Sequence, residues 1–206
     1  MGKKTIVTIG REFGSGGREI GHLVAERLNV SCYDNELITQ VAKKSGFCEE
    51  ILKKHDEKPT GSFLYSLVMD SYYNHNTILG QAGMPLSQQL FLAQFNTIKT
   101  IASKEDCVFI GRCADYALKD DFNILSVFIN SDDKSKIERI SKRHNVSAQK
   151  AREMMIKTDK KRASYYNYYT DKRWGNSSSY DLCINSGKLG IEKTAELILS
   201  YLDIYK

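Results

Sequence analysis

Residues 5–28 read TIVTIGREFGSGGREIGHLVAERL, and this stretch decides the fold. Its first part is a short apolar, β-branched run that ends at Gly10, which is typical of a central parallel strand covered on both faces. Its last part carries apolar residues at helical spacing, namely Ile20, Leu23, Val24 and Leu28. A glycine-rich segment, residues 14–17, joins the two parts. The stretch therefore predicts a strand, a tight turn and an amphipathic helix in immediate succession.

The glycine-rich turn predicts an anion-binding site. A helix that begins directly after such a turn leaves backbone N–H groups unpaired, and the positive end of the helix dipole adds to their effect. A tight turn that binds no ligand is the alternative, although open α/β sheets commonly bind ligands at turns of this kind. We expect the phosphates of ATP to bind at Gly14, Ser15, Gly16, Gly17 and Arg18.

The turn departs from both standard nucleotide-binding patterns. The dinucleotide pattern G-x-G-x-x-G fails because Glu19 stands where its last glycine is required. The mononucleotide pattern G-x-x-x-x-G-K-[ST], aligned on Gly16, has Arg11 in place of its first glycine. In the same alignment Gly17 replaces the lysine and Arg18 replaces the hydroxyl residue. The loop therefore lacks the lysine that reaches the phosphates and the hydroxyl group that binds Mg²⁺.

Length and composition favour one cytoplasmic α/β domain that binds small anions. The 206 residues suffice for one domain with an insertion, and the net charge of +5 is compatible with anionic ligands without requiring a nucleic acid. Five cysteines form no C-x-x-C pair, so we expect reduced thiols. We recognise neither a signal peptide nor an apolar run of membrane-spanning length, so we expect a cytoplasmic protein with no membrane partner.

Four further apolar runs predict strands, at residues 29–33, 107–110, 124–129 and 181–185. Helical patterns lie between them, and right-handed crossovers make the strands of such a sheet parallel. The predicted fold class is therefore α/β, with a five-stranded parallel sheet and helices on both faces. We expect residues 1–206 to form a single domain, with a helical insertion at about 57–104 and a further helix pair at about 132–175.

These motifs resemble those of the cytidylate-kinase-like family, which is related to the P-loop nucleoside monophosphate kinases. The resemblance rests on IVTIGREFGSGGREIGHLVAERL at residues 6–28, YDNELI at 33–38, VFIGRCADYAL at 108–118, LSVFI at 125–129 and the segment 157–190. It implies a P-loop kinase fold, ATP as phosphoryl donor, Mg²⁺, and an acceptor similar to CMP. It also implies that the helical insertion closes over the acceptor nucleotide and that the later helix pair forms a lid.

Candidate acceptor-binding residues follow the predicted strands, because ligands bind at the carboxyl edge of open parallel sheets. Asp34 follows the second strand, where it caps a helix, contacts a ligand, or does both. The related kinases carry Asp-Gly-Arg-Asp after the third strand; Arg112 matches the arginine that binds the acceptor phosphate, whereas Ile110 and Cys113 replace the aspartates. We assign Asp34, Arg112 and Asp115 to the acceptor. A salt bridge between Arg112 and Asp115 is the alternative.

Basic residues on the helix pair after the fourth strand are candidate catalytic groups. Arg139 and Arg143 lie four residues apart and share a helix face, and Arg162 follows on the second helix. Together with Arg18, these arginines can neutralise the charge of a transferred phosphoryl group, which is most of what a protein contributes to this reaction. A solvated helical face is the alternative for each of them singly.

Three functions remain open on these grounds. The leading interpretation is ATP-dependent phosphoryl transfer to a nucleoside monophosphate, CMP or dCMP. The alternative is a catalytically degenerate module that binds a nucleotide without turnover, because the loop lysine and a carboxylate at Ile110 are missing. RNA binding through the aromatic and basic residues 165–174 is weaker, since their spacing favours packing of the lid against the sheet. No residue is assigned to a metal; the nucleotide would hold Mg²⁺, helped by Asp34 through water.

Overall fold

The computed structural model describes residues 4–34 and 85–205, and it contains the predicted sheet. The strands are β1 (Ile6–Arg11), β2 (Ser31–Tyr33), β3 (Cys107–Ile110), β4 (Ile124–Asn130) and β5 (Leu182–Asn185). They form one five-stranded sheet in the order β2-β3-β1-β4-β5, and every neighbouring pair is parallel. The predicted fold class is confirmed. β1 lies at the centre, with its carboxyl end between those of β3 and β4.

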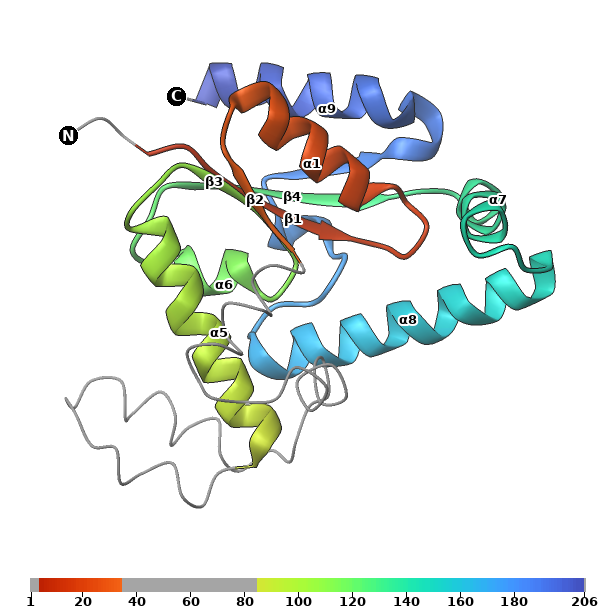
Figure 1. Ribbon diagram of the computed structural model, residues 1–206, viewed down its shortest axis with the longest axis horizontal. Helices are drawn as coiled ribbons and strands as arrows, with labels where there is room; N and C mark the ends of the chain where they lie inside the picture. The colour runs from red at the N-terminus through yellow and green to blue at the C-terminus, as the bar shows by residue number, and fades with distance from the viewer. Residues whose placement is uncertain (1–3, 35–84, 206) are drawn as a thin grey trace.

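Helices cover both faces of the sheet (Figure 1). The described helices are α1 (Gly17–Leu28), α5 (Leu86–Ala102), α6 (Ala114–Leu118), α7 (Asp133–His144), α8 (Ala148–Tyr169) and α9 (Ser186–Tyr205), with a short 3₁₀ turn at Ser177–Ser179. α1 and α9 lie side by side on one face, and α5 and α6 lie on the other (Figure 1). None of the described helices is long and apolar enough to cross a membrane.

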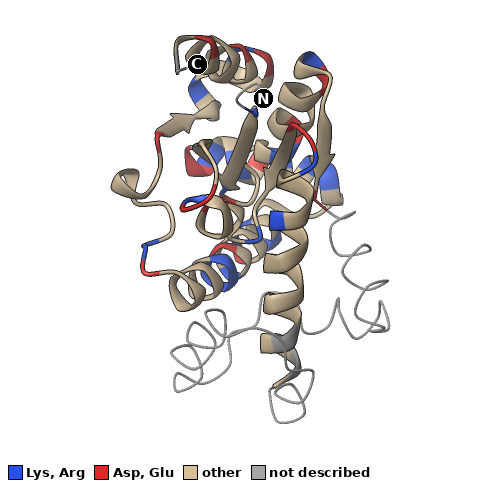
Figure 2. Cartoon of the chain, turned by 90° about the vertical axis from the view of Figure 1, so that its left-hand side faces the viewer, with Lys and Arg blue, Asp and Glu red and all other residues tan. Residues whose placement is uncertain are grey.

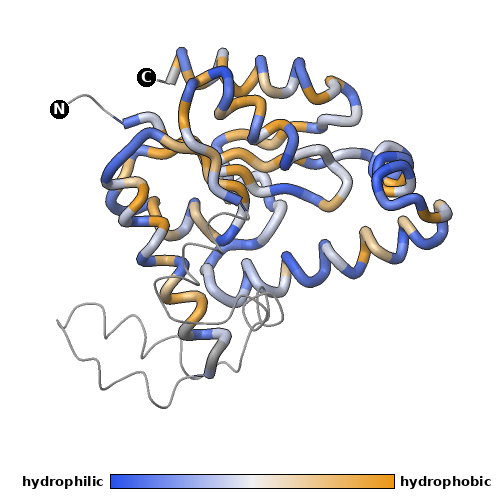
Figure 3. Tube along the Cα trace, viewed as in Figure 1, coloured by the Kyte–Doolittle hydropathy of each residue, from blue (hydrophilic) through white to orange (hydrophobic). Residues whose placement is uncertain are grey.

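Successive side chains of β1 point to opposite faces of the sheet, so this one strand contributes to the hydrophobic cores on both faces. Val7 and Ile9 point into a core formed with α1 and α9, whereas Ile6 points into a core formed with α5 and α6. All three side chains are at most 2% exposed. Figure 3 shows that hydrophobic residues concentrate in the strands, while hydrophilic residues dominate α7. The sheet is thus buried on both faces, and its carboxyl edge is left to carry the polar loops.

Side-chain caps set where the two helices after β4 begin. The Asp132 carboxylate accepts from the backbone N–H of Ser135 at 2.9 Å, and Ser147 accepts from the N–H of Lys150 at 3.3 Å. Both caps satisfy N–H groups that have no partner inside the helix.

The tyrosines of α8 are structural residues. Tyr165, Tyr166 and Tyr169 are buried, and Tyr169 stacks on Phe91 of α5 with ring centroids 3.9 Å apart. Tyr116 of α6 belongs to the same aromatic cluster. These rings pack α8 against α5 and α6, and Trp174 after α8 packs on Phe128 of β4, as expected for packing against the sheet. Because the rings of Tyr165, Tyr166 and Tyr169 are buried, they are not exposed for stacking on the bases of a nucleic acid.

Two expected elements lie outside the described residues. The helix that Asp34 was expected to cap, and the first part of the expected helical insertion, fall on residues 35–84. The second expected helix of the insertion is α5, whose residues Ile98, Ile101 and Ala102 pack in the core beneath β1 and β3.

Candidate active site

A cavity of about 430 Å³ opens at the carboxyl end of β1. Its lining includes three glycines of the predicted phosphate loop, Gly14, Gly16 and Gly17. Its charged lining consists of Arg11, Arg18, Arg112, Arg139, Arg143 and Arg162, with Glu12 and Asp34 as the carboxylates. Six guanidinium groups against two carboxylates make the cavity strongly attractive to anions. The fold therefore brings together five arginines that were assigned separately from the sequence, and it adds Arg11.

The loop itself has the geometry of an anion site. Gly14 has φ +83° and Gly16 has φ +77°, a left-handed conformation that favours glycine. Among the described residues, the backbone N–H groups of Gly14, Gly16 and Arg18 have no acceptor. Since these groups precede or begin α1, they are available to an anionic ligand at the positive end of the helix dipole.

Ser15 is the member of the predicted loop that turns away from the cavity. Its hydroxyl donates to the carbonyl of Glu12 at 2.9 Å and accepts from the N–H of Gly17 at 3.3 Å. Its own N–H donates to the Glu12 carbonyl, and its carbonyl accepts from the hydroxyl of Ser186 in α9. Ser15 is fully buried, so it holds the shape of the loop.

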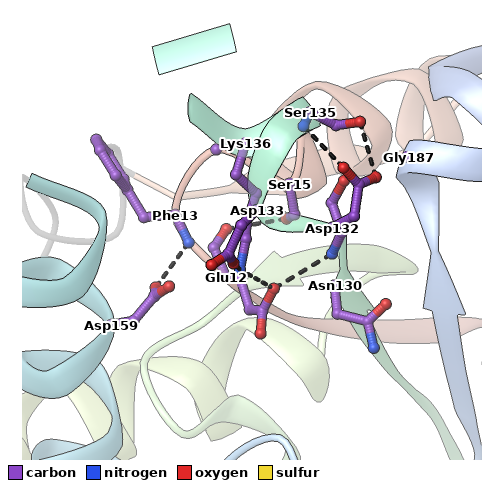
Figure 4. A network of polar contacts seen from close by, with 12 residues as sticks. Glu12, Phe13, Ser15, Asn130, Asp132, Asp133, Ser135, Lys136, Asp159 and Gly187 are labelled. Atoms are coloured by element: carbon purple, nitrogen blue, oxygen red, sulfur yellow. Dashed lines mark hydrogen bonds and ion pairs between the residues drawn. The ribbon is translucent and has the colours of Figure 1, made fainter. Parts of the chain in front are cut away.

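Helix α7 is tied directly onto the loop. Arg139 donates to the carbonyl of Gly14, and Arg143 pairs with Glu19 of α1. Figure 4 shows the buried end of this contact, where Lys136 lies 3.0 Å from Glu12. Burial alone would lower the pKa of Lys136, but its hydrogen bonds and charge contacts with Glu12 and Asp133 outweigh burial and raise it. Lys136 therefore stays charged and anchors α7 over the loop.

Helix α8 reaches the same loop from the other side. The Asp159 carboxylate accepts from the N–H of Phe13 at 2.7 Å (Figure 4). Arg162, one turn further on, donates to the carbonyl of Arg11 at 3.1 Å. Figure 2 shows Lys and Arg side by side with a few acidic residues on the helices below the sheet. Asp159 and Arg162 thus connect α8, part of the expected lid, to the backbone that leads from β1 into the glycine-rich loop.

Asp159 supplies a testable dependence of stability on pH. Burial raises its pKa from 3.8 to about 6, against the opposing effects of the Phe13 N–H group and Arg162. A carboxyl group with a raised pKa in the folded state adds most to stability below pH 3.8, and that contribution is lost as the pH rises through about 6. Asp159→Asn keeps an acceptor for Phe13 but does not ionise. The difference in melting temperature, Asp159→Asn minus wild type, should therefore be larger at pH 8 than at pH 4.5.

The expected size of this difference follows from the pKa shift, which corresponds to at most about 3 kcal/mol and to several degrees in Tm. Asp203→Asn is the control, because Asp203 is exposed on α9. Scanning calorimetry at both pH values measures the effect. Equal shifts for Asp159→Asn at pH 4.5 and pH 8 would contradict the assignment.

Arg18 pairs with neither Glu12 nor Glu19. Its Nε atom lies 2.8 Å from Oδ2 of Asp34, which follows β2. The Asp34 side chain is only 10% exposed, and its other oxygen lies 3.8 Å from Nη2 of Arg11. One buried carboxylate therefore orients two guanidinium groups at the mouth of the loop.

The loop after β3 aims Arg112 into the same cavity. Gly111, Arg112 and Cys113 all have positive φ, at +78°, +60° and +52°. Two consecutive non-glycine residues in this conformation store strain, which concentrates at functional sites. Arg112 lines the large cavity and also a smaller one beneath it, which Asp115 shares.

Asp115 lies deeper than an exposed acceptor-binding residue would. Burial raises its pKa, although its hydrogen bond from the Tyr166 hydroxyl, 2.5 Å long, has the opposite effect. Burial and then the charge of Asp115 raise the pKa of Tyr166, so the phenol keeps its proton and donates. The pair packs α6 against α8 at the floor of the smaller cavity.

The described residues do not form a metal site. They contain no cluster of three or more His, Cys, Asp or Glu side chains that could hold an ion. Of the two cavity carboxylates, Glu12 is paired with Lys136 and accepts from the N–H of Ser131, while Asp34 is paired with Arg18. Mg²⁺ takes oxygen ligands, and here the oxygens already serve cations of the protein.

The five-stranded parallel sheet with helices on both faces is the fold of the P-loop kinases. The chain belongs to the cytidylate kinase-like family, whose model matches residues 6–188. A crystal structure of an uncharacterized protein from Eubacterium ventriosum ATCC 27560 is 32% identical, with 97% of this chain and 99% of that chain covered and a TM-score of 0.73.

More distant structures share the fold alone. Shikimate kinase from Bacteroides thetaiotaomicron is 15% identical, covering 97% of this chain and 98% of that chain, with a TM-score of 0.55. Shikimate kinase from Acinetobacter baumannii is 13% identical, covering 99% and 95%, with a TM-score of 0.51. Comparison with curated proteins gave no match.

Three site residues were missed from the sequence. Arg11 was counted only as a departure from the mononucleotide pattern, and Asp159 and Lys136 were not singled out as contacts of the loop. Arg11 could have been found, because a charged residue that ends a buried central strand lies at the ligand-binding edge of the sheet. Nothing local marks the other two, whose partners lie more than 120 residues away.

Proposed function

We propose that this protein transfers the γ-phosphoryl group of ATP to a nucleoside monophosphate, with CMP or dCMP as the acceptor. The observation that carries the proposal is the cavity in which six arginines surround a glycine-rich loop at the start of a helix. A kinase of this kind must bring two anionic nucleotides together, so it needs positive charge on several sides of the transferred group. The family match supports the nucleotide acceptor.

The residues divide between donor and acceptor by their place in the fold. The loop N–H groups, Arg18 and the α7 arginines Arg139 and Arg143 lie on the donor side. Arg112, with Asp115 beneath it, lies on the acceptor side across the carboxyl edge of the sheet. Arg162 lines both cavities, so we assign it to the region between the two nucleotides.

The chemistry places few demands on acid–base groups. An ionised oxygen of the acceptor phosphate attacks the γ-phosphorus, a new P–O bond forms, and the bond to the β-phosphate oxygen breaks. The electron pair leaves on ADP, and no proton has to be removed from the attacking oxygen. The protein's part is to align the groups and neutralise the charge that moves from one to the other.

Magnesium enters this proposal only as a companion of the nucleotide, since the described residues offer it no carboxylate set. We therefore expect ATP affinity to depend strongly on Arg18 and weakly on Mg²⁺. Calorimetry with and without EDTA, for the wild type and Arg18→Ala, measures both dependences. Tight binding that is lost in EDTA but survives Arg18→Ala would show that this expectation is wrong.

A coupled assay of ADP release tests the function. Wild-type protein is supplied with ATP and, in turn, CMP, dCMP, UMP, AMP and GMP. CMP and dCMP should give the highest kcat/KM. If ATP binds by calorimetry but no acceptor raises ADP release above the rate without acceptor, the protein is a nucleotide-binding module and the proposed activity is wrong. The missing loop lysine is the observation that keeps this second candidate open.

A further inference from the structure

Arg11 stands where the mononucleotide pattern has its first glycine, and its side chain lines the cavity. It ends β1, the central strand, and its side chain is 15% exposed. It lines both the large cavity and the smaller one that contains Asp115. It therefore lies between the loop assigned to the donor and the arginine assigned to the acceptor phosphate.

The Arg11 side chain fills the space in which a lysine at position 17 would begin. A Cβ atom built on Gly17 would lie 2.5 Å from Cβ of Arg11 and 3.1 Å from its Cγ. Real Cβ atoms do not approach other carbons that closely, so the two positions cannot both carry a side chain in this arrangement. Position 17 carries the lysine in the standard loop, whereas here it is a glycine beside which the Arg11 side chain leaves no room for another side chain.

The guanidinium group of Arg11 is held in place from two sides. It lies against Gly111 after β3, where an added Cβ would be 2.0 Å from Nη1 and 3.0 Å from Cζ. Its Nη2 atom lies 3.8 Å from the buried carboxylate of Asp34. Arg162 donates to the Arg11 carbonyl, which fixes the backbone beneath the side chain.

We propose that Arg11 is a catalytic residue that supplies, from the end of the central strand, the positive charge that the loop lysine supplies in standard P-loops, with Asp34 as its positioning residue. The inference rests on the proposed phosphoryl transfer and names the group that contacts the transferred phosphoryl. A guanidinium can bind two phosphate oxygens at once, so one Arg11 side chain can contact the γ-phosphoryl group while Asp34 keeps its orientation.

Arg11→Ala is the first test. We expect kcat for the best acceptor to fall about 100- to 1000-fold, the loss typical of removing one preorganised donor to a transition state. ATP affinity should fall about 10- to 150-fold, whereas AMP, which lacks the β- and γ-phosphates, should bind with little change. Arg11→Lys should recover part of the loss. Arg27→Ala, which removes an arginine paired with Glu196 away from the cavity, is the control and should match the wild type.

A charge-swap cycle separates a catalytic role from a structural one. Gly17→Lys alone should be poorly active, because the new side chain meets Arg11. Arg11→Gly alone should lose activity as Arg11→Ala does. The double variant Arg11→Gly/Gly17→Lys restores the standard pattern and should be at least tenfold more active than either single variant. A structural role for Arg11 predicts no such recovery, and melting temperatures of all variants show which of them fold.

The outcomes separate this inference from the function on which it rests. If the wild type turns over an acceptor and Arg11→Ala does so equally well, the Arg11 assignment is wrong and the proposed function stands. If the wild type binds ATP without turnover, the proposed function is wrong, and the assignment is judged on ATP affinity alone. If the wild type binds no ATP, both are wrong.

Discussion

Replacing Arg112 with alanine is expected to raise the KM for the acceptor at least tenfold while leaving the KM for ATP nearly unchanged. A charge-assisted hydrogen bond contributes about 1.5–3 kcal/mol, and about 1.4 kcal/mol is a factor of ten. The positive φ of Arg112 aims its side chain into the cavities at the carboxyl end of β3, on the side of the sheet edge away from α7. Arg112→Lys should restore only part of the affinity, because a point charge does not reproduce the two-pronged guanidinium.

Arg173→Ala provides a control for this result. Arg173 lies in the loop after α8 and lines neither of the two cavities. Its removal lowers the net charge by the same amount, so any general effect of charge on nucleotide binding appears in both variants. Steady-state kinetics with the acceptor and ATP varied in turn measure the two KM values. If Arg112→Ala keeps the acceptor KM of the wild type, Arg112 has a structural role in its strained turn.

Replacing Gly14 with alanine is expected to lower the stability of the protein and to abolish high affinity for ATP. Alanine at φ +83° is strained by about 1–2 kcal/mol. Its Cβ would also lie 2.9 Å from the backbone carbonyl oxygen of Lys136 and 2.8 Å from Cδ1 of Ile140, and overpacking of this kind costs about 1–3 kcal/mol. Because the carbonyl belongs to α7, the helix must shift, and Arg139 and Arg143 shift with it.

The melting temperature of Gly14→Ala should therefore fall by several degrees or more. Gly175→Ala is the matched control. Gly175 also has a positive φ, of +72°, but the nearest atoms to a Cβ there belong to the ring of Phe128, at 3.3 Å or more. It should lose stability through strain and keep wild-type affinity for ATP. Calorimetry of unfolding and of ATP binding on both variants measures this. Normal ATP affinity in folded Gly14→Ala would mean that the position of α7 does not matter to the donor site.

The local elements could be predicted from the sequence because their causes are local. The β-branched run in β1 and the apolar spacing of α1 act within a few positions of the chain, and the strands predicted from the sequence are present. The parallel sheet followed from the alternation of strands and helices. The loop was identified from its run of glycines between a strand and a helix, and the structure adds the left-handed backbone at Gly14 and Gly16.

The sequence by itself therefore determined the α/β fold, the position of the glycine-rich loop and the residue types that surround it. Only the tertiary structure decided which charges meet. Arg18 pairs with Asp34 rather than with a neighbouring glutamate, and the Arg11 side chain fills the space beside Gly17. Asp159 of α8 accepts a hydrogen bond from the N–H of Phe13. The physical reason is that a charged side chain pairs with whatever the packing of distant elements brings near, and the positions of α7 and α8 are set by contacts with residues far away in the chain.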